Sequence, residues 1–126
     1  MNKKLLIGKG GFSYVYKVRE KYSYKTFALK KMSKEKIISK HCEKTIINER
    51  KLLSRLKHPF LINIYYAFQD NDYLYLILDY LSGGDLRFHL KKKINFTEKQ
   101  ARFIIANIFI AIEFIHSHNV IHRDIK

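Results

Sequence analysis

The chain has 126 residues, a single cysteine and a formal net charge of +14, and its length fits one domain at most. Because Cys42 has no second cysteine to pair with, a disulfide framework is excluded and a reducing, cytoplasmic location is favoured, with the nucleus left open. Charged residues interrupt the apolar stretches before the roughly 18 residues of a membrane span, so we expect neither a spanning segment nor a signal peptide.

The positive charge allows two interpretations. Lysines are scattered along the chain, the longest run is residues 91–93, and no nucleic-acid-binding motif accompanies them. This distribution favours a solvated lysine-rich surface and no specific nucleic-acid partner. A basic module that binds polyanions is the alternative, and its binding would depend steeply on salt.

The first third of the chain has the pattern of β-strands. Residues 5–8 and 14–19 flank a glycine-containing turn, and residues 26–32 form a further extended segment after a polar connection. Alternating β-branched and aromatic residues beside a glycine turn predict a hairpin, which a third strand then follows.

In residues 33–56 the apolar residues recur with a helical period. Pro59 comes just after this helix and prevents it from continuing. Spacings of three and four place one glutamate in an otherwise apolar face, whose members are Ile46, Glu49, Leu53 and Leu56. A carboxylate on such a face is costly unless it has a partner.

Two more extended segments, residues 61–68 and 73–80, surround the polar turn 69–72 and predict a second hairpin. Residues 85–90 then form a short helix after two glycines. Thr97 and Gln100 have the spacing of a capping box, so a long helix should run from Glu98 to about His116. It is apolar around most of its circumference, as is typical of a helix buried on several sides. Without neighbouring helices to cover it, its outer face should lie exposed, self-associate or be covered by another protein.

The glycine turn is the first motif with a chemical meaning. Small residues let backbone amides approach phosphate oxygens closely, so the turn could bind phosphate groups. A strand follows the glycines, which excludes the dinucleotide-binding motif, where a helix would follow. An ordinary β-turn stays open as the alternative. The candidate phosphate-binding residues are Gly8, Lys9, Gly10, Gly11, Phe12 and Ser13.

Ala28 and Lys30 form the second motif, because alternate residues of a strand share one face. A small residue beside a cation on one face suits an adenine ring next to a phosphate group. The alternative is an ordinary surface lysine. Glu49 favours the first interpretation, since it needs a cationic partner on its apolar helix face, and we predict an ion pair between Lys30 and Glu49.

The sequence ends in His122-Arg123-Asp124-Ile125-Lys126. Together with the earlier motifs, taken in their order along the chain, this ending makes the sequence resemble the protein kinases. Within that family it is most similar to the AGC-type serine/threonine kinases, including the group called YANK. The likeness covers essentially the whole chain. Its further motifs are Gly8-x-Gly10, Val15, Ala28-x-Lys30, Glu49, Leu78-Asp79-Tyr80-Leu81 and Gly83-Gly84-Asp85-Leu86.

The resemblance implies an α+β fold. Residues 1–81 would form a kinase-like amino-terminal lobe with its hinge, a twisted antiparallel sheet with one regulatory helix. Residues 82–126 would supply the first helices of a helical carboxy-terminal lobe. The implied function is transfer of the ATP γ-phosphoryl group to protein serine or threonine, and Lys126 favours this class over tyrosine kinases.

The resemblance also implies a role for individual residues. Asp124 would accept the proton of the substrate hydroxyl, Lys126 would contact the γ-phosphate, and Lys30, oriented by Glu49, would contact the α- and β-phosphates. Ser13 departs from the family pattern, which has a third glycine there. The residues implied to surround adenosine are Val15, Ala28 and Leu86 on the ring faces, Leu78 behind the ring, Asp79 and Leu81 at its edge, and Asp85 at the ribose.

The magnesium ligands of the family come after the catalytic lysine. No residue of this sequence is therefore predicted to bind the metal, and we expect the 126-residue polypeptide by itself to be inactive. A second class of function stays open, a truncated regulatory or decoy protein that binds a partner protein through its long apolar helix.

Overall fold

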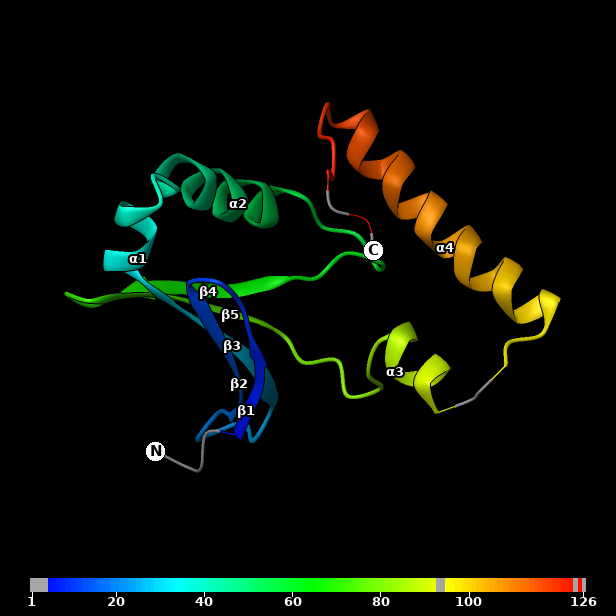
Figure 1. Ribbon diagram of the computed structural model, residues 1–126, viewed down its shortest axis with the longest axis horizontal. Coiled ribbons are helices and arrows are strands. Elements are labelled where there is room, and N and C mark those ends of the chain that lie inside the picture. The colour runs from blue at the N-terminus through cyan, green and yellow to red at the C-terminus, as the bar shows by residue number, and fades with distance from the viewer. Residues whose placement is uncertain (1–4, 93–94, 124, 126) are drawn as a thin grey trace. The chain divides into compact units, whose positions relative to one another are not determined.

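A five-stranded antiparallel sheet forms the first part of the structure, a computed structural model that describes residues 5–92, 95–123 and 125 (Figure 1). The chain divides into two compact units. The first consists of the part up to Lys57 together with Ile62–Tyr80, and the second of His58–Leu61 together with the part from Leu81 on. Each unit is described by itself.

The strands of the first unit follow the predicted hairpins. They lie in the order β1-β2-β3-β5-β4, and every neighbouring pair is antiparallel. The elements of this unit are β1 (Leu5–Lys9), β2 (Ser13–Arg19), β3 (Thr26–Ser33), α1 (Lys34–Ser39), α2 (Glu43–Arg55), β4 (Ile64–Gln69) and β5 (Tyr73–Asp79).

The helical stretch after β3 is two helices, where the sequence predicted one over residues 33–56. Ser33 caps α1, because its Oγ accepts a hydrogen bond from the Lys36 amide at 3.3 Å. Between α1 and α2 the chain turns at His41, whose φ is 51°. Such a left-handed residue ends a helix, and neither glycine nor proline marks the place in the sequence. The prediction of a single helix was wrong for this reason.

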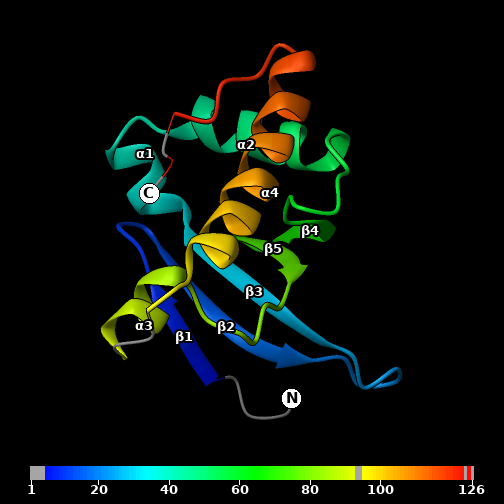
Figure 2. The same ribbon diagram turned by 90° about the vertical axis from the view of Figure 1, so that its right-hand side faces the viewer.

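The core of the first unit lies between the two helices and one face of the sheet. Figure 1 and Figure 2 show α1 and α2 against the same face. Alternate residues of the central strands supply the sheet's share of the core, as the period of a strand requires. The buried cluster consists of Ala28 and Met32 from β3, Leu76 and Leu78 from β5, Ile37 from α1 and Ile46 from α2.

Strand β4 begins at Ile64, three residues later than the sequence predicted. The segment His58–Leu61 belongs instead to the second unit, where the Leu61 amide donates to the His58 carbonyl at 3.0 Å. A turn closed by this bond replaces the predicted start of the strand.

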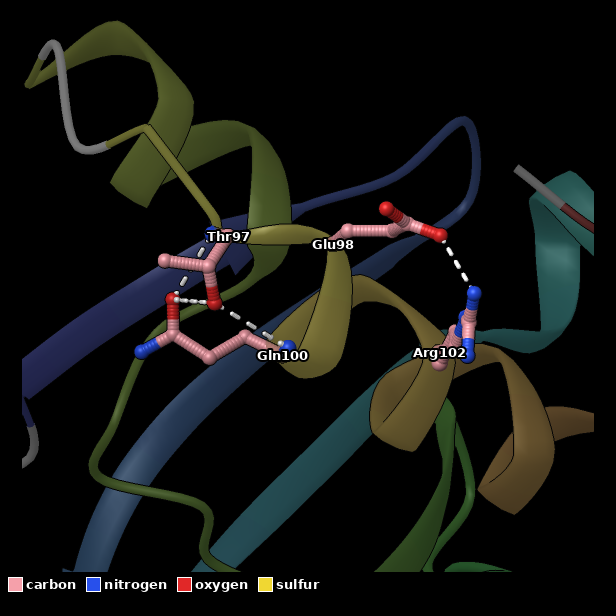
Figure 3. A network of polar contacts seen from close by, with 4 residues as sticks. All are labelled: Thr97, Glu98, Gln100 and Arg102. Carbon is pink, nitrogen blue, oxygen red and sulfur yellow. Dashed lines mark hydrogen bonds and ion pairs between the residues drawn. The ribbon is translucent and has the colours of Figure 1, made fainter.

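The second unit contains α3 (Leu86–Lys91) and α4 (Glu98–Ser117). The predicted capping box is confirmed: the Gln100 amide donates to Thr97 Oγ1 at 3.3 Å, and the Thr97 amide donates to Gln100 Oε1 at 2.9 Å (Figure 3). Helix α4 therefore begins where the sequence predicted.

The expected exposure of the outer face of α4 is confirmed for the part of the chain that the structure describes. Ile115 is the one buried residue of the helix, while Phe103 and Phe109 are 68% and 65% exposed. The helix is also long and apolar enough to cross a membrane, contrary to the expectation from charge spacing. Because core helices of soluble proteins have the same length and composition, this match is weak evidence for a span.

Candidate active site

Lys30 and Glu49 form an ion pair in the first unit. Lys30 shares a face of β3 with Ala28 and Met32, which join the core, so its side chain points toward the helices. Glu49 lies three residues after the buried Ile46 on α2. The Lys30 Nζ and Glu49 Oε1 atoms are 2.6 Å apart, which confirms the predicted pair.

The pair is partly exposed, with 21% of the Lys30 side chain and 36% of the Glu49 side chain accessible. Solvent screens charges at such sites, so the pair adds little to the stability of the fold. Its effect is instead to fix where the Lys30 ammonium lies, on a strand that belongs to the rigid core.

The glycine turn between β1 and β2 is closed by its own backbone. The Gly10 amide donates to the Ser13 carbonyl at 2.8 Å. A Cβ atom on Gly10 would lie 2.9 Å from Ser13 Oγ, closer than real Cβ contacts. Ser13 is buried and so fills the inside of the turn, at the place where the kinase pattern has its third glycine. A larger residue at position 10 would require the Ser13 hydroxyl to move.

The turn is also attached to the end of β3. The Ser33 amide donates to the Phe12 carbonyl at 3.0 Å, and the Phe12 side chain packs against the buried cluster. Val15, two residues after Ser13, lies directly opposite Lys30 in the β2–β3 ladder. The structure thus places the turn and the ammonium of Lys30 on neighbouring strands.

A second ammonium lies near this turn, that of Lys40. A Cβ atom on Gly11 would be 3.5 Å from Lys40 Nζ. Lys40 follows α1 in the connection to α2. This connection was not predicted, because the helical period of residues 33–56 indicated one continuous helix. The described ion pairs are Lys30–Glu49 and Arg102–Glu98, so Lys40 has no carboxylate partner among the described residues.

An apolar surface adjoins the ammonium of Lys30. Ala28 and Leu78 lie opposite one another in the β3–β5 ladder, and both are buried in the core cluster. Val15 packs against the same cluster. Small and apolar side chains beside a cation and a glycine turn are chemically suited to a ring that carries phosphate groups.

Of the remaining predicted residues, Asp79, the last residue of β5, lies in the first unit. Leu81, Asp85 and Leu86 lie in the second unit, and the others lie outside the described residues. In the second unit, Leu81 is 75% exposed, and Asp85 Oδ1 accepts a hydrogen bond from the Phe88 amide at 2.6 Å. Asp85 is thus the N-cap of α3, which begins at Leu86, whereas the predicted helix began at Asp85. The predicted catalytic Asp124 and Lys126 lie outside the described residues.

The described residues offer groups that bind phosphate rather than a cluster of metal-ligating side chains. Within residues 5–92, 95–123 and 125, no group of three or more histidine, cysteine, aspartate or glutamate side chains could hold a metal. The described chain therefore contributes cations and backbone amides. Both recognise phosphate oxygens.

Residues 1–126 match the protein kinase domain family over their whole length. The chain belongs to the protein kinase family. This membership confirms the predicted fold class, and the five-stranded sheet with its two helices is the amino-terminal part of that fold.

The curated relatives of this kinase chain are serine/threonine-protein kinases. It is 42% identical to a probable serine/threonine-protein kinase of Dictyostelium discoideum over 98% of the chain. It is 43% identical to the serine/threonine-protein kinase sgk-1 of Caenorhabditis elegans over 95% of the chain. It is 46% identical to the RAC-beta serine/threonine-protein kinase A of Xenopus laevis over 96% of the chain. The matched regions are 27%, 26% and 25% of those proteins, so the chain spans about a quarter of their length.

Proposed function

We propose that this chain is the ATP-binding portion of a serine/threonine protein kinase, which transfers the ATP γ-phosphoryl group to serine or threonine of a protein substrate. The observation that carries the proposal is the 2.6 Å pair of Lys30 and Glu49, on the strand that neighbours the glycine turn. Charge neutralisation and positioning are the main contributions of a protein to phosphoryl transfer. A fixed ammonium beside backbone amides supplies both.

Each residue group has a defined part in this proposal. ATP supplies the phosphoryl group, and Mg²⁺ would come with it. Lys30 would hold the α- and β-phosphates, and Glu49 would keep its ammonium in place. The turn around Gly10 would cover the phosphates, and Asp124 and Lys126 would act at the substrate hydroxyl and the γ-phosphate. With a single cysteine, the protein would work in a reducing, cytoplasmic environment.

The test is phosphoryl transfer from ATP to serine and threonine peptides by the full-length protein that contains this sequence. Lys30→Met should lower kcat/KM to about one hundredth or less. The matched control is Lys31→Met, since Lys31 lies on the other face of β3, with Nζ 3.5 Å from the centre of the Tyr73 ring. If Lys30→Met and Lys31→Met reduce the rate equally, the proposal is wrong.

The 126-residue polypeptide by itself should bind ATP only weakly and transfer no phosphate. It supplies the glycine turn and Lys30 but no predicted magnesium ligand, so we expect a dissociation constant weaker than roughly 1 mM, about 4 kcal/mol. Calorimetry with ATP and Mg²⁺ measures it. Tight magnesium-dependent binding, or turnover that survives Asp124→Asn, would show that other residues bind the metal.

A regulatory or decoy role is the second candidate, and the exposed apolar surface of α4 favours it. Phe103 and Phe109 are each more than half exposed, and large exposed apolar patches mark interfaces. A protein that acts in this way would bind its partner unchanged after Lys30→Met, whereas a kinase would lose its activity.

A further inference from the structure

Three side chains form a row across the end of the sheet, on the face opposite the core. Phe27 of β3 and Asp79 of β5 lie opposite one another in the ladder. Tyr65 of β4 completes the row, because β5 lies between β3 and β4. The Tyr65 ring meets the Phe27 ring edge-on, with centroids 5.0 Å apart. Asp79, between them, is the last residue of β5.

The Asp79 carboxylate accepts three hydrogen bonds. Its Oδ2 accepts from the backbone amide and from the side-chain amide of Asn63, both at 2.8 Å. Its Oδ1 accepts from the Tyr65 hydroxyl at 2.7 Å. In return, the Asp79 amide donates to the Asn63 carbonyl at 3.2 Å. Both oxygens and the backbone of Asp79 are thus tied to the start of β4.

A β-bulge makes room for the Tyr65 bond. Ile64 pairs with Leu78 and Tyr66 pairs with Ile77, so Tyr65 has no partner in the ladder. A bulged residue is released from regular pairing and can direct its side chain differently. Tyr65 therefore reaches back to Asp79, which a regular ladder would place diagonally from it.

The bonds keep Asp79 ionised. Burial by itself would raise the pKa of the Asp79 carboxyl, but the hydrogen bonds from the Asn63 backbone, the Tyr65 hydroxyl and the Asn63 side chain outweigh burial and lower the pKa. At neutral pH the acceptor carries its full charge. Hydrogen bonds to a charged acceptor are stronger than those between neutral groups.

The place of this network gives it a functional meaning. Asp79 and Leu81 are the residues whose backbone the kinase resemblance assigns to the edge of adenine, so whatever fixes Asp79 fixes the start of that segment. We propose that Asn63 and Tyr65 are positioning residues, which act through the Asp79 carboxylate to hold the main chain at the end of β5 in the conformation that receives adenine. The proposal rests on the proposed ATP-dependent function.

The test compares Tyr65→Phe with Tyr66→Phe in the full-length protein. The first removes one hydroxyl from Asp79 and keeps the ring that meets Phe27. The second removes a hydroxyl from a neighbouring tyrosine on the same strand, 59% exposed against 50% for Tyr65. Tyr65→Phe should raise the dissociation constants of adenosine and ADP by the same factor, about three- to tenfold. Binding of inorganic triphosphate should not change, because it lacks adenine.

Hydrogen exchange of the nucleotide-free protein gives a readout that does not depend on ATP. The amides of Asn63 and Asp79 donate to the network, so both should exchange roughly fivefold faster in Tyr65→Phe than in the wild type. Tyr66→Phe should leave both rates unchanged. Asn63→Ala is the second variant, and it should show the same selective loss of adenosine binding.

The results separate this inference from the function on which it rests. A wild-type protein that binds no ATP would refute the proposed function. A wild type that binds ATP, with adenosine affinity unchanged in Tyr65→Phe, would overturn the inference alone. Faster exchange without a loss of adenosine affinity would also overturn it, since the network would then serve the sheet only. A loss that extends equally to inorganic triphosphate would do the same.

Discussion

The Lys30 ammonium and the Glu49 carboxylate lie 2.6 Å apart although 19 positions of sequence separate them. Their contact depends on two buried neighbours, Met32 on the strand and Ile46 on the helix, which belong to the same core cluster. The position of a charged pair is therefore set by apolar packing. It follows that changes in the pair and changes in the core should have different effects.

Glu49→Gln should reduce activity far more than stability. The glutamine keeps the size of the side chain but loses the charge that positions Lys30, and a small misplacement of a reacting group costs roughly 100-fold in rate. The free energy of unfolding should change by less than about 1 kcal/mol, because the pair is partly exposed. Urea unfolding and steady-state kinetics of the full-length protein measure the two effects. Glu43→Gln, on the same helix, is the control, and equal losses of rate in both variants would contradict the prediction.

Tyr75 should titrate unusually late. Its hydroxyl donates to Asp70 Oδ2 at 2.7 Å; this bond, with burial and the charge of Asp70, raises the pKa of Tyr75 to about 12. Because the folded pKa lies above the unfolded value of about 10, the bond's contribution to stability is complete below pH 10. It is lost as the pH rises toward about 12.

Asp70→Asn should return the pKa of Tyr75 toward 10, its ordinary value. Ultraviolet absorbance of tyrosinate follows the titration, and the difference between the wild type and Tyr75→Phe isolates the signal of this tyrosine. Identical Tyr75 titrations with and without Asp70 would refute the assignment.

The capping box should contribute measurably to α4. Thr97→Ala removes the oxygen that accepts from the Gln100 amide, and we expect a loss of about 1 kcal/mol in the free energy of unfolding. Thr97→Ser keeps that oxygen and should cost much less. The neighbouring pair of Glu98 and Arg102 is 78% and 79% exposed, so Arg102→Ala should change the same quantity by only about 0.3–0.5 kcal/mol. Chemical denaturation, monitored by circular dichroism, ranks the three variants by their free energy of unfolding.

The exposed face of α4 should cause the 126-residue polypeptide to self-associate. Phe103 and Phe109 present apolar rings to solvent, and burying them between copies removes that area from water. Replacing both with serine should shift sedimentation toward the monomer. Mixing with neutral phospholipid vesicles tests whether a lipid surface covers the helix instead. Sedimentation as a monomer before any substitution would show that the face is covered within the chain.

Local sequence patterns predicted most of the sheet. Alternation in residues 14–19 and 26–32 is a short-range signal, and those segments are strands β2 and β3 in the structure. The capping box was predictable for the same reason, since Thr97 and Gln100 are three positions apart and lie within one turn. The Lys30–Glu49 pair was predictable across a longer distance because a lone carboxylate on an apolar face demands a partner.

The missed features depend on geometry that the sequence does not encode locally. The left-handed His41 separates α1 from α2, although residues 33–56 keep a helical period throughout. The bond of Tyr65 to Asp79 depends on a bulge, and no glycine marks this bulge in the sequence. For α4, an apolar circumference shows what a helix could bury, while the neighbours that would bury it are a matter of tertiary structure.

Ser33 links the glycine turn to helix α1 through two hydrogen bonds. Its amide holds the Phe12 carbonyl of the glycine turn at 3.0 Å, while its hydroxyl receives the Lys36 amide in the first turn of α1 at 3.3 Å. A displacement of the turn must therefore break the first bond or carry Ser33 along and disturb the second. Backbone relaxation at residue 12 and at residue 36 should be correlated, because the two hydrogen bonds of Ser33 link the glycine turn to the start of α1.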